Sequence, residues 1–359
     1  MTARRQFRFW MIGLGAALVV LWLLSDVLLP FVAGMAIAYL LDPPADRLER
    51  LGMARWLATT LVLVGFTLLV LLVLLLLLPL IQAQIIQLLE TLPLIVAWVR
   101  ESLIPLVETM LLRLSEEDLG RLRSAVGSFA GDAVGWIAAL AQRVITGGVA
   151  LFDVLSLLFI TPIVAFYLLR DWDPMIARMR SWLPRQHAPV ILAQAAEVDR
   201  TLAGFVRGQA SVCLVLGLFY ALALSFAGLE FGLVIGLLAG LLSFIPFVGS
   251  LVGFAGSVGI ALFQYDTWLM VGIVAAIFLI GQAVEGNILT PRLVGGRVGL
   301  HPVWVIFALL AGGSLFGFLG VLLAVPVAAV IGVLIRFALA QYLASRYYTG
   351  STPSTPDPS

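Results

Sequence analysis

One polar stretch near the end of a long apolar run reads QAVEGNILTPR, starting at Gln282. Gln282 and Glu285 are three residues apart, so on a helix they share one face. Glu285 could exchange a proton or coordinate a cation, while Gln282 and Asn287 can donate and accept hydrogen bonds to a polar solute. Ionisable residues inside a membrane are functional candidates by default. The alternative is that Glu285 lies at a helix end and pairs with Arg292 or Arg297.

Further candidates lie where two other apolar runs are broken. Ser243 and Ser314 are at the breaks, where hydroxyls and freed carbonyls could hold an ion; alternatively, they satisfy broken backbone hydrogen bonds locally. Charged residues beside these runs could gate a cytoplasmic mouth, although such residues more often form an interfacial salt-bridge face. Together with Ser243 and Ser314, the predicted pathway residues include Thr290 and Gln209. The predicted gating residues at the breaks are Pro246, Gly249, Gly317 and Gly320, and those at the mouth are Arg207, Arg292 and His301.

Two features of the broken runs favour a structural role. Gly232, Gly236 and Gly240 recur every four residues, and such a stripe of small residues lets helices approach closely. We expect it to pack against a neighbouring helix instead of binding a ligand. His301 precedes Pro302 and is expected to cap the helix that starts there, with pH sensing as the alternative.

The composition indicates which solvent the chain needs. Of its 359 residues, 62% are hydrophobic and only 11% are charged, whereas about one-quarter of a soluble domain is charged. So little polar surface cannot cover the chain in water, which predicts a lipid bilayer as its partner. The net charge of +1 gives no indication of nucleic-acid binding.

The same composition argues against several kinds of chemistry. The single cysteine, Cys213, excludes an intrachain disulfide and a multi-cysteine metal site, and the two histidines form no ligand-spaced motif. The chain has no lysine, which excludes a P-loop lysine and with it ATP-driven pumping by this chain alone. Hydrolase and metalloprotease motifs are absent from the sequence. We therefore expect no enzyme activity, no catalytic residue, no cofactor and no metal.

The apolar runs predict an all-α, polytopic membrane protein. Single spans are predicted at 9–24, 27–41, 56–80, 146–169, 209–227 and 266–284. Two longer runs, 231–263 and 303–337, are broken in the middle by glycine, serine or proline. They predict helical hairpins, either two short spans each or re-entrant pairs. Charges return over 81–145 and apolar residues recur there at helical spacing, which predicts an amphipathic helical insertion outside the membrane.

The arginines indicate an orientation. If each hairpin returns to its starting side, the arginine-rich connections all fall on one side, which the positive-inside rule identifies as the cytoplasm. Both termini are then cytoplasmic and the 81–145 insertion is extracellular. The predicted segments are a three-span scaffold (1–80), the insertion (81–145), a fourth span with a cytoplasmic connector (146–208), a transport domain (209–345) and a disordered tail (346–359).

The two broken runs resemble each other at a constant offset. Phe247 aligns with Phe318, Gly249 with Gly320, and Pro246 faces another helix breaker. Chance matches are common in such sequence, but the first run starts outside and the second inside. An inverted repeat of a span plus a hairpin is typical of transporters whose substrate binds where broken helices meet.

Several of these stretches resemble the motifs of one known family. They are Gln-x-x-Glu-Gly-Asn, Thr-Pro-Arg and Gly-Leu-His-Pro between Gln282 and Pro302, together with FIPFVG from Phe244, FGFLG from Phe316 and FYLLRD from Phe166. From about residue 30 to 343 the chain is similar to the autoinducer-2 exporter family, also called PerM-like permeases. The resemblance implies a bacterial inner-membrane transporter and a homo-oligomer, with a pentamer suggested by the family. Family members are associated with export of small signalling molecules or with sodium/proton antiport.

Sequence and resemblance together favour a secondary transporter that exports a small polar solute or signalling molecule by alternating access. Its hairpin tips would act as gates and Glu285 as the coupling or substrate contact, with a proton or sodium ion as coupling partner. One alternative is a cation/proton antiporter. Alternatives of another class are a channel, which broken helices also permit, and a non-transporting scaffold that recruits partners through 81–145.

Overall fold

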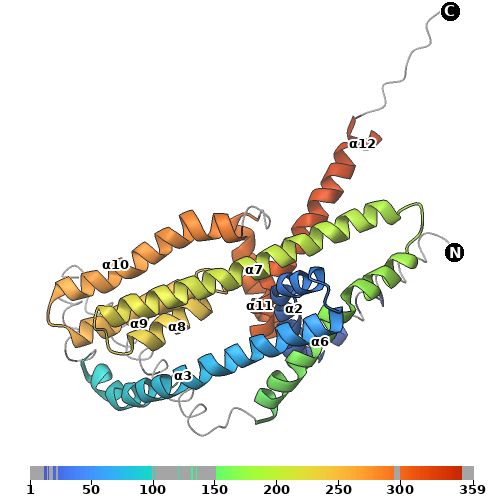
Figure 1. Ribbon diagram of the computed structural model, residues 1–359. Helices are drawn as coiled ribbons and strands as arrows, with labels where there is room; N and C mark the ends of the chain where they lie inside the picture. The colour runs from blue at the N-terminus through green and yellow to red at the C-terminus, as the bar shows by residue number, and fades with distance from the viewer. Residues whose placement is uncertain are drawn as a thin grey trace, which may run out of the picture. The chain divides into compact units, whose positions relative to one another are not determined.

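The computed structural model describes residues 12–13, 15, 19–21, 23–98, 101, 120, 131, 135, 151–294 and 300–349. Within these residues every regular element is a helix, which confirms the all-α prediction (Figure 1). Half of the predicted first span and most of the predicted 81–145 insertion lie outside the described residues.

The chain forms two compact units, each assembled from segments that are far apart in sequence. Unit 1 comprises Met1–Thr60, Thr161–Gln209 and Thr290–Ser359, and unit 2 comprises Leu61–Ile160 and Ala210–Leu289. Four helices contribute to both units, because the boundaries fall inside them. The five consecutive segments predicted from the sequence divide the chain by expected role, whereas the two units divide it by contacts. The predicted segments therefore stay a prediction.

Unit 1 is built around α2. Its helices are α2 (Ser25–Arg50), the start of α3 (Arg55–Trp98), most of α6 (Leu151–Ser181), the first half of α7 (Ala188–Phe226), the end of the π-helix η2 (Glu285–Val294), α11 (Pro302–Leu343) and α12 (Arg346–Thr349). A Cβ on Gly34 would overlap the Val164 side chain, so α2 and α6 pack closely at this glycine. Beside it, the Thr161 hydroxyl donates to the Pro30 carbonyl at 3.3 Å.

A tight turn at the end of α2 leads into α3. Gly52 has φ +94°, a conformation that favours glycine, and its N–H donates to the Glu49 carbonyl. The N–H of Met53 donates to the Leu48 carbonyl, and this pair of bonds is a Schellman motif. The turn therefore reverses the chain within a few residues and returns Arg55 beside the last turns of α2.

Unit 2 contains the first predicted hairpin. Its arms are α8 (Gly232–Leu242) and α9 (Val248–Gln264), and α9 also contacts α10 (Trp268–Val284). The glycine stripe of α8 faces α7: a Cβ on Gly236 would overlap the backbone of Ala221, and one on Gly240 the backbone of Gly217. The packing role expected for this stripe is confirmed, because the two helix backbones touch where side chains are missing.

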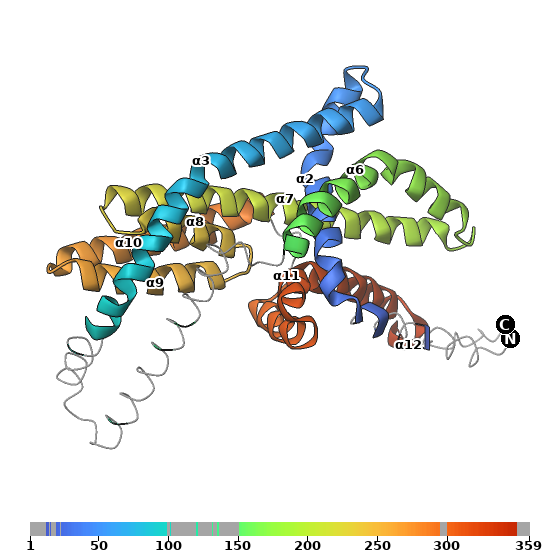
Figure 2. The same ribbon diagram turned by 90° about the horizontal axis from the view of Figure 1, so that it is seen from below.

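The second predicted hairpin is α11, whose helix is interrupted at Phe316 and Gly317. Gly317 has φ +57° and ψ −137°, which a residue with a Cβ rarely adopts. The two arms fold back on each other so closely that a Cβ on Gly320 would overlap the Gly312 carbonyl. The arms are drawn in orange-red and red in Figure 2.

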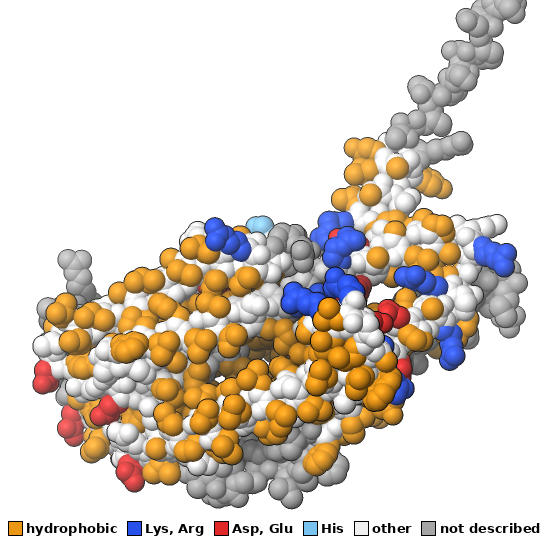
Figure 3. Space-filling model, viewed as in Figure 1, with side chains coloured by type: hydrophobic (Ala, Val, Ile, Leu, Met, Phe, Trp, Pro, Cys, Tyr) orange, Lys and Arg blue, Asp and Glu red, His pale blue; other side chains and the backbone are white. Residues whose placement is uncertain are grey.

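Five of the described helices are long and apolar enough to cross a membrane: Val27–Arg50, Arg55–Thr91, Ala188–Phe226, Trp268–Val294 and Pro302–Leu343. Large hydrophobic side chains are exposed along them, as the orange surface of Figure 3 shows. Such a surface suits lipid, since hydrocarbon tails and not water are the solvent for it.

Several helices continue beyond the spans predicted for them. The 44 residues of α3 correspond to about 66 Å at 1.5 Å per residue, twice the ~30 Å hydrocarbon core. Hydropathy changes near Leu80, but the helix does not end there, even at Pro79. In the same way α7 joins the predicted connector and the fifth span without a break.

Candidate functional site

The first predicted pair meets in unit 2 at the end of α10. The Gln282 amide nitrogen donates to a carboxylate oxygen of Glu285 at 2.8 Å, and both residues are half-buried. The shared helix face expected from their spacing is therefore confirmed. The Gln282 amide is neutral, so it holds the Glu285 carboxylate in place without compensating its negative charge.

Glu285 also begins η2, and this π-helix contains the rest of the polar stretch. A π-helix is wider than an α-helix and is rare beyond single bulges, which concentrate at functional sites. Asn287, Thr290 and Arg292 are exposed along it. The Asn287 amide nitrogen donates to the Ala283 carbonyl at 2.8 Å, so part of its hydrogen-bonding capacity is used within the helix.

A buried tyrosine that sequence reasoning missed lies beside this pair. Tyr220 of α7 is 0% exposed and stacks on Phe278 of α10, with ring centroids 4.4 Å apart. Its ring occupies the space that a side chain at Gly281 would need. Its hydroxyl has no hydrogen bond of normal geometry, although the Gln282 side chain is near enough to interact with it. A tyrosine inside an otherwise apolar span was the signal that could have found it.

The tip of the first hairpin is closed by local contacts. The buried Ser243 hydroxyl donates to the Ala239 carbonyl at 2.8 Å. Pro246 is half-buried in the turn, where Phe247 has φ +68°. Gly249 packs onto Ser243, whose backbone nitrogen a Cβ would overlap. The sequence thus placed the break correctly, and Ser243 satisfies a helix carbonyl there.

The second hairpin tip follows a similar plan in unit 1. The exposed Ser314 hydroxyl donates to the Ala311 carbonyl at 2.9 Å, just before the interruption at Gly317. At the start of α11, His301 Nδ1 accepts the N–H of Val303 at 3.4 Å, with Pro302 in the first turn. His301 therefore caps the helix as expected.

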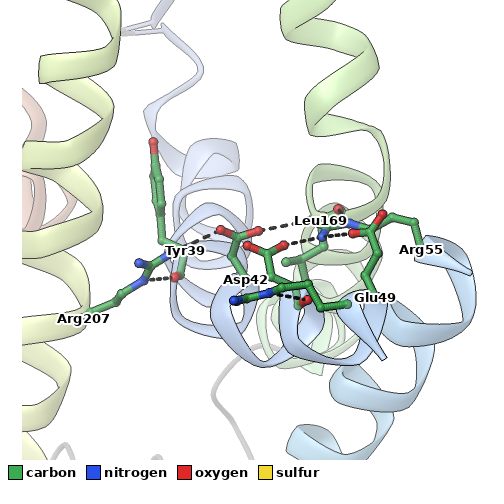
Figure 4. A network of polar contacts seen from close by, with 8 residues as sticks. Tyr39, Asp42, Glu49, Arg55, Leu169 and Arg207 are labelled. Atoms are coloured by element: carbon green, nitrogen blue, oxygen red, sulfur yellow. Dashed lines mark hydrogen bonds and ion pairs between the residues drawn. The ribbon is translucent and has the colours of Figure 1, made fainter. Parts of the chain in front are cut away.

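Arg207, predicted at the cytoplasmic mouth, belongs to a polar network in unit 1 (Figure 4). Its Nε donates to the Tyr39 carbonyl at 2.6 Å, and a terminal nitrogen lies 3.3 Å from the Asp42 carboxylate. The Tyr39 hydroxyl donates to Asp199 at 2.9 Å. Gln209, two residues after Arg207, is buried.

Arg55 is the centre of the same network. Its guanidinium lies 3.1 Å from Asp42, 2.5 Å from Asp46 and 2.9 Å from Glu49, and its Nε donates to the Leu169 carbonyl at 3.0 Å. One side chain thereby ties the last turns of α2 to the middle of α6. The sequence signal was present, since acids spaced along α2 precede an arginine, but the partner carbonyl is 114 residues away.

A cavity of about 500 Å³ lies within unit 1 beside this network. Tyr39, Asp42, Trp172, Asp199 and Arg207 are among its lining residues. Nearby, Asp171 is engaged by Arg170, whose hydrogen bonds at 2.7 and 2.8 Å lower the pKa of the Asp171 carboxyl.

The predicted site residues thus fall into two sets. Unit 2 holds Gln282, Glu285, Asn287, Ser243, Pro246 and Gly249, and unit 1 holds Arg207, Gln209, Thr290, Arg292, His301, Ser314, Gly317 and Gly320. Among the described residues no group of three or more His, Cys, Asp or Glu side chains could hold a metal ion.

In the part of the chain that the structure describes, all regular elements are helices and five are long and apolar enough to cross a membrane, which defines a polytopic helical membrane protein as the class. The chain belongs to the family described as AI-2E family transporter, whose sequence profile matches residues 11–340.

The chain is similar in sequence to transport proteins of several bacteria. The chain is 28% identical over 321 residues to "Putative transport protein YrrI" of Bacillus subtilis (strain 168), covering 87% of each chain. It is 29% identical over 335 residues to "Putative permease PerM" of Escherichia coli (strain K12), covering 88% of this chain and 89% of the relative. It is 31% identical to "Putative transport protein sll0063" of Synechocystis, covering 82% and 73%. The resemblance inferred from the motifs is confirmed.

Proposed function

We propose that this transporter is a secondary exporter that moves a small polar solute by alternating access, with Glu285 as the carboxylate that contacts the solute or its coupling ion. The family description points to autoinducer-2 as the first solute to test. Export, the coupling ion and the bacterial inner membrane with cytoplasmic termini are parts of the same proposal, as are the inverted repeat and the homo-oligomer.

The Gln282–Glu285 pair carries this proposal. It is half-buried at the end of the apolar helix α10, where the backbone changes to a π-helix. A charged carboxylate in such a place is energetically costly unless a partner compensates it, and a solute or ion that binds transiently could be that partner. The buried Tyr220 hydroxyl beside it adds a polar group with unused hydrogen-bonding capacity. Together these groups could receive a hydroxyl-rich solute or a cation.

The other predicted residues take supporting roles in this mechanism. Ser243 and Ser314 would hold the hairpin tips by the serine-to-carbonyl bonds described above, and the glycine and proline positions beside them would let the tips gate the path. Asn287 and Thr290, both in η2, would contact the solute. Gln209 would line the pathway, and the cytoplasmic mouth of that pathway would be formed by Arg207, Arg292 and His301.

The Glu285→Gln variant is expected to assemble normally and to lose transport, because glutamine keeps the shape but cannot carry charge. The measurement is uptake of labelled autoinducer-2 into everted vesicles or proteoliposomes, with the variant falling to the level of protein-free liposomes. The matched control is Glu230→Gln, the same change at an exposed position of unit 2. Wild-type flux in Glu285→Gln would eliminate the role given to this carboxylate.

A cation/proton antiporter is the second candidate, because Gln282 leaves the charge of Glu285 available to a cation. A sodium pulse applied to proteoliposomes loaded with a pH-sensitive dye would then alkalinise the lumen in the wild type but not in Glu285→Gln. Flux that saturates and follows an ion gradient would also argue against a channel. Flux that survives deletion of residues 81–145 would count against a scaffold.

A further inference from the structure

The cavity of unit 1 has a charge pattern that the transport proposal does not use. Its arginines are matched: Arg207 lies beside Asp42, and Arg200 lies 2.5 Å from Glu197. Asp199, which lines the same cavity, has the Tyr39 hydroxyl as its one hydrogen-bond partner among the residues that the structure describes. The lining therefore holds two carboxylates and two arginines, and Asp199 is the lining carboxylate that neither arginine engages in these ion pairs.

Asp42 cannot supply its negative charge to a ligand. Its carboxylate already accepts from Arg55 at 3.1 Å and lies 3.3 Å from Arg207. Asp171, next in sequence to the lining residue Trp172, is occupied by Arg170. Among the lining residues that the structure describes, Asp199 is the one whose carboxylate has spare acceptor positions.

The wall beside Asp199 is aromatic. Tyr39 and Trp172 both line the cavity, with ring centroids 6.3 Å apart at an interplanar angle of 66°. The tyrosine is held in place at both ends, because its hydroxyl donates to Asp199 and its carbonyl accepts from Arg207. Aromatic faces combined with a carboxylate are the surroundings that organic ammonium ions prefer.

We propose that this cavity binds a small organic ammonium ion, with Asp199 receiving the positive charge and Trp172 and Tyr39 forming the aromatic wall. A volume of about 500 Å³ is in the usual range for small-molecule sites. An inorganic cation would gain from Asp199 but not from the apolar part of this wall. An anion would be repelled by Asp199 and would find both lining arginines already paired with carboxylates. The inference does not rest on the role of Glu285.

Choline and ethanolamine are the probes, measured by equilibrium binding of the radiolabelled compounds to the full-length protein in lipid nanodiscs. Saturable binding of at least one of them is expected. The neutral isostere of choline, dimethylbutanol, has a carbon in place of the nitrogen and is not expected to compete. Competition by this alcohol as strong as that by choline, or binding of neither probe, would overturn the proposal.

Asp199→Asn is expected to weaken binding by about tenfold or more, because it removes the charge while leaving an oxygen for the Tyr39 hydroxyl. The matched control is Asp173→Asn, the same change at an exposed carboxylate next to Trp172. Equal binding by wild type and Asp199→Asn would show that this carboxylate does not receive the positive charge. Equal losses in Asp199→Asn and Asp173→Asn would show only general charge attraction, and either result would overturn the proposal.

Trp172 gives a second, independent test. Trp172→Leu is expected to weaken binding by about threefold to thirtyfold, and Trp172→Phe to restore most of the loss, because cation–π attraction needs a ring. A phenylalanine variant as weak as the leucine variant would contradict the aromatic part of the proposal. Since these assays measure binding without flux, they can fail while the Glu285 proposal holds, and the reverse is also true.

Discussion

Replacing Gly240 by alanine is expected to lower the free energy of unfolding of unit 2 by about 3 kcal/mol, because α8 could no longer reach α7. A Cβ there would overlap the Gly217 backbone and lie 3.0 Å from the Cys213 carbonyl oxygen. Neither neighbour is a flexible side chain that could move away. The helix propensity of alanine works in the opposite direction, by up to about 1 kcal/mol, and is outweighed.

The measurement is the midpoint of heat-induced loss of the monodisperse peak on size exclusion. Gly256→Ala is the matched control, because that glycine is exposed in α9 and a Cβ on it would touch nothing within 4 Å. The two substitutions should therefore act with opposite signs, with the control unchanged or slightly more stable. Equal midpoints for both variants would mean that close contact between α7 and α8 does not limit stability.

Replacing Arg55 by glutamine should destabilise unit 1 by about 2–3 kcal/mol, because three carboxylates would lose their shared cation. The arginine side chain is only 18% exposed, whereas Asp42, Asp46 and Glu49 are 38–47% exposed. Because solvent screens those carboxylates, the expected loss of stability is smaller than for a fully buried network. Arg55→Lys should recover only part of the loss, since an ammonium cannot reproduce the guanidinium fork.

The control for Arg55 is Arg200→Gln, which removes one exposed ion pair and should change stability by less than about 1 kcal/mol. Adding Asp46→Asn to Arg55→Gln should return part of the lost stability by relieving repulsion between carboxylates. The same heat-and-separate assay reports each variant. An Arg55→Gln protein as stable as wild type would show that the other contacts of α2 hold unit 1 together without this cation.

Hydropathy and residue spacing were sufficient for the class of fold. The bilayer requirement, the helical hairpins, the cap at His301 and the shared face of Gln282 and Glu285 all depend on neighbours in sequence, so local patterns contain the information. The packing of the Gly236 stripe was also predictable, because the missing side chains themselves indicate a close contact.

What the sequence did not reveal depends on partners far apart in the chain. Asp199 meets Tyr39 across 160 residues, and Tyr220 meets Phe278 through the packing of two helices. Helix ends differ from the ends of the predicted spans for another reason: hydropathy detects where the solvent changes, whereas a helix stops only where its backbone finds other partners. This is why α3 continues past Leu80.

Four helices run from one unit into the other with no loop between, and this restricts how a transport cycle could operate. The boundaries fall at Thr60, Ile160, Gln209 and Leu289. Any rocking of the units must then be absorbed as bending or torsion inside a helix, which is easiest where the hydrogen-bond ladder is already weak. Two crossings have such a residue beside them, Pro162 and Pro291, because proline lacks the N–H of that ladder. Helices that can bend at these residues would act as hinges between the two units, with no flexible linker needed.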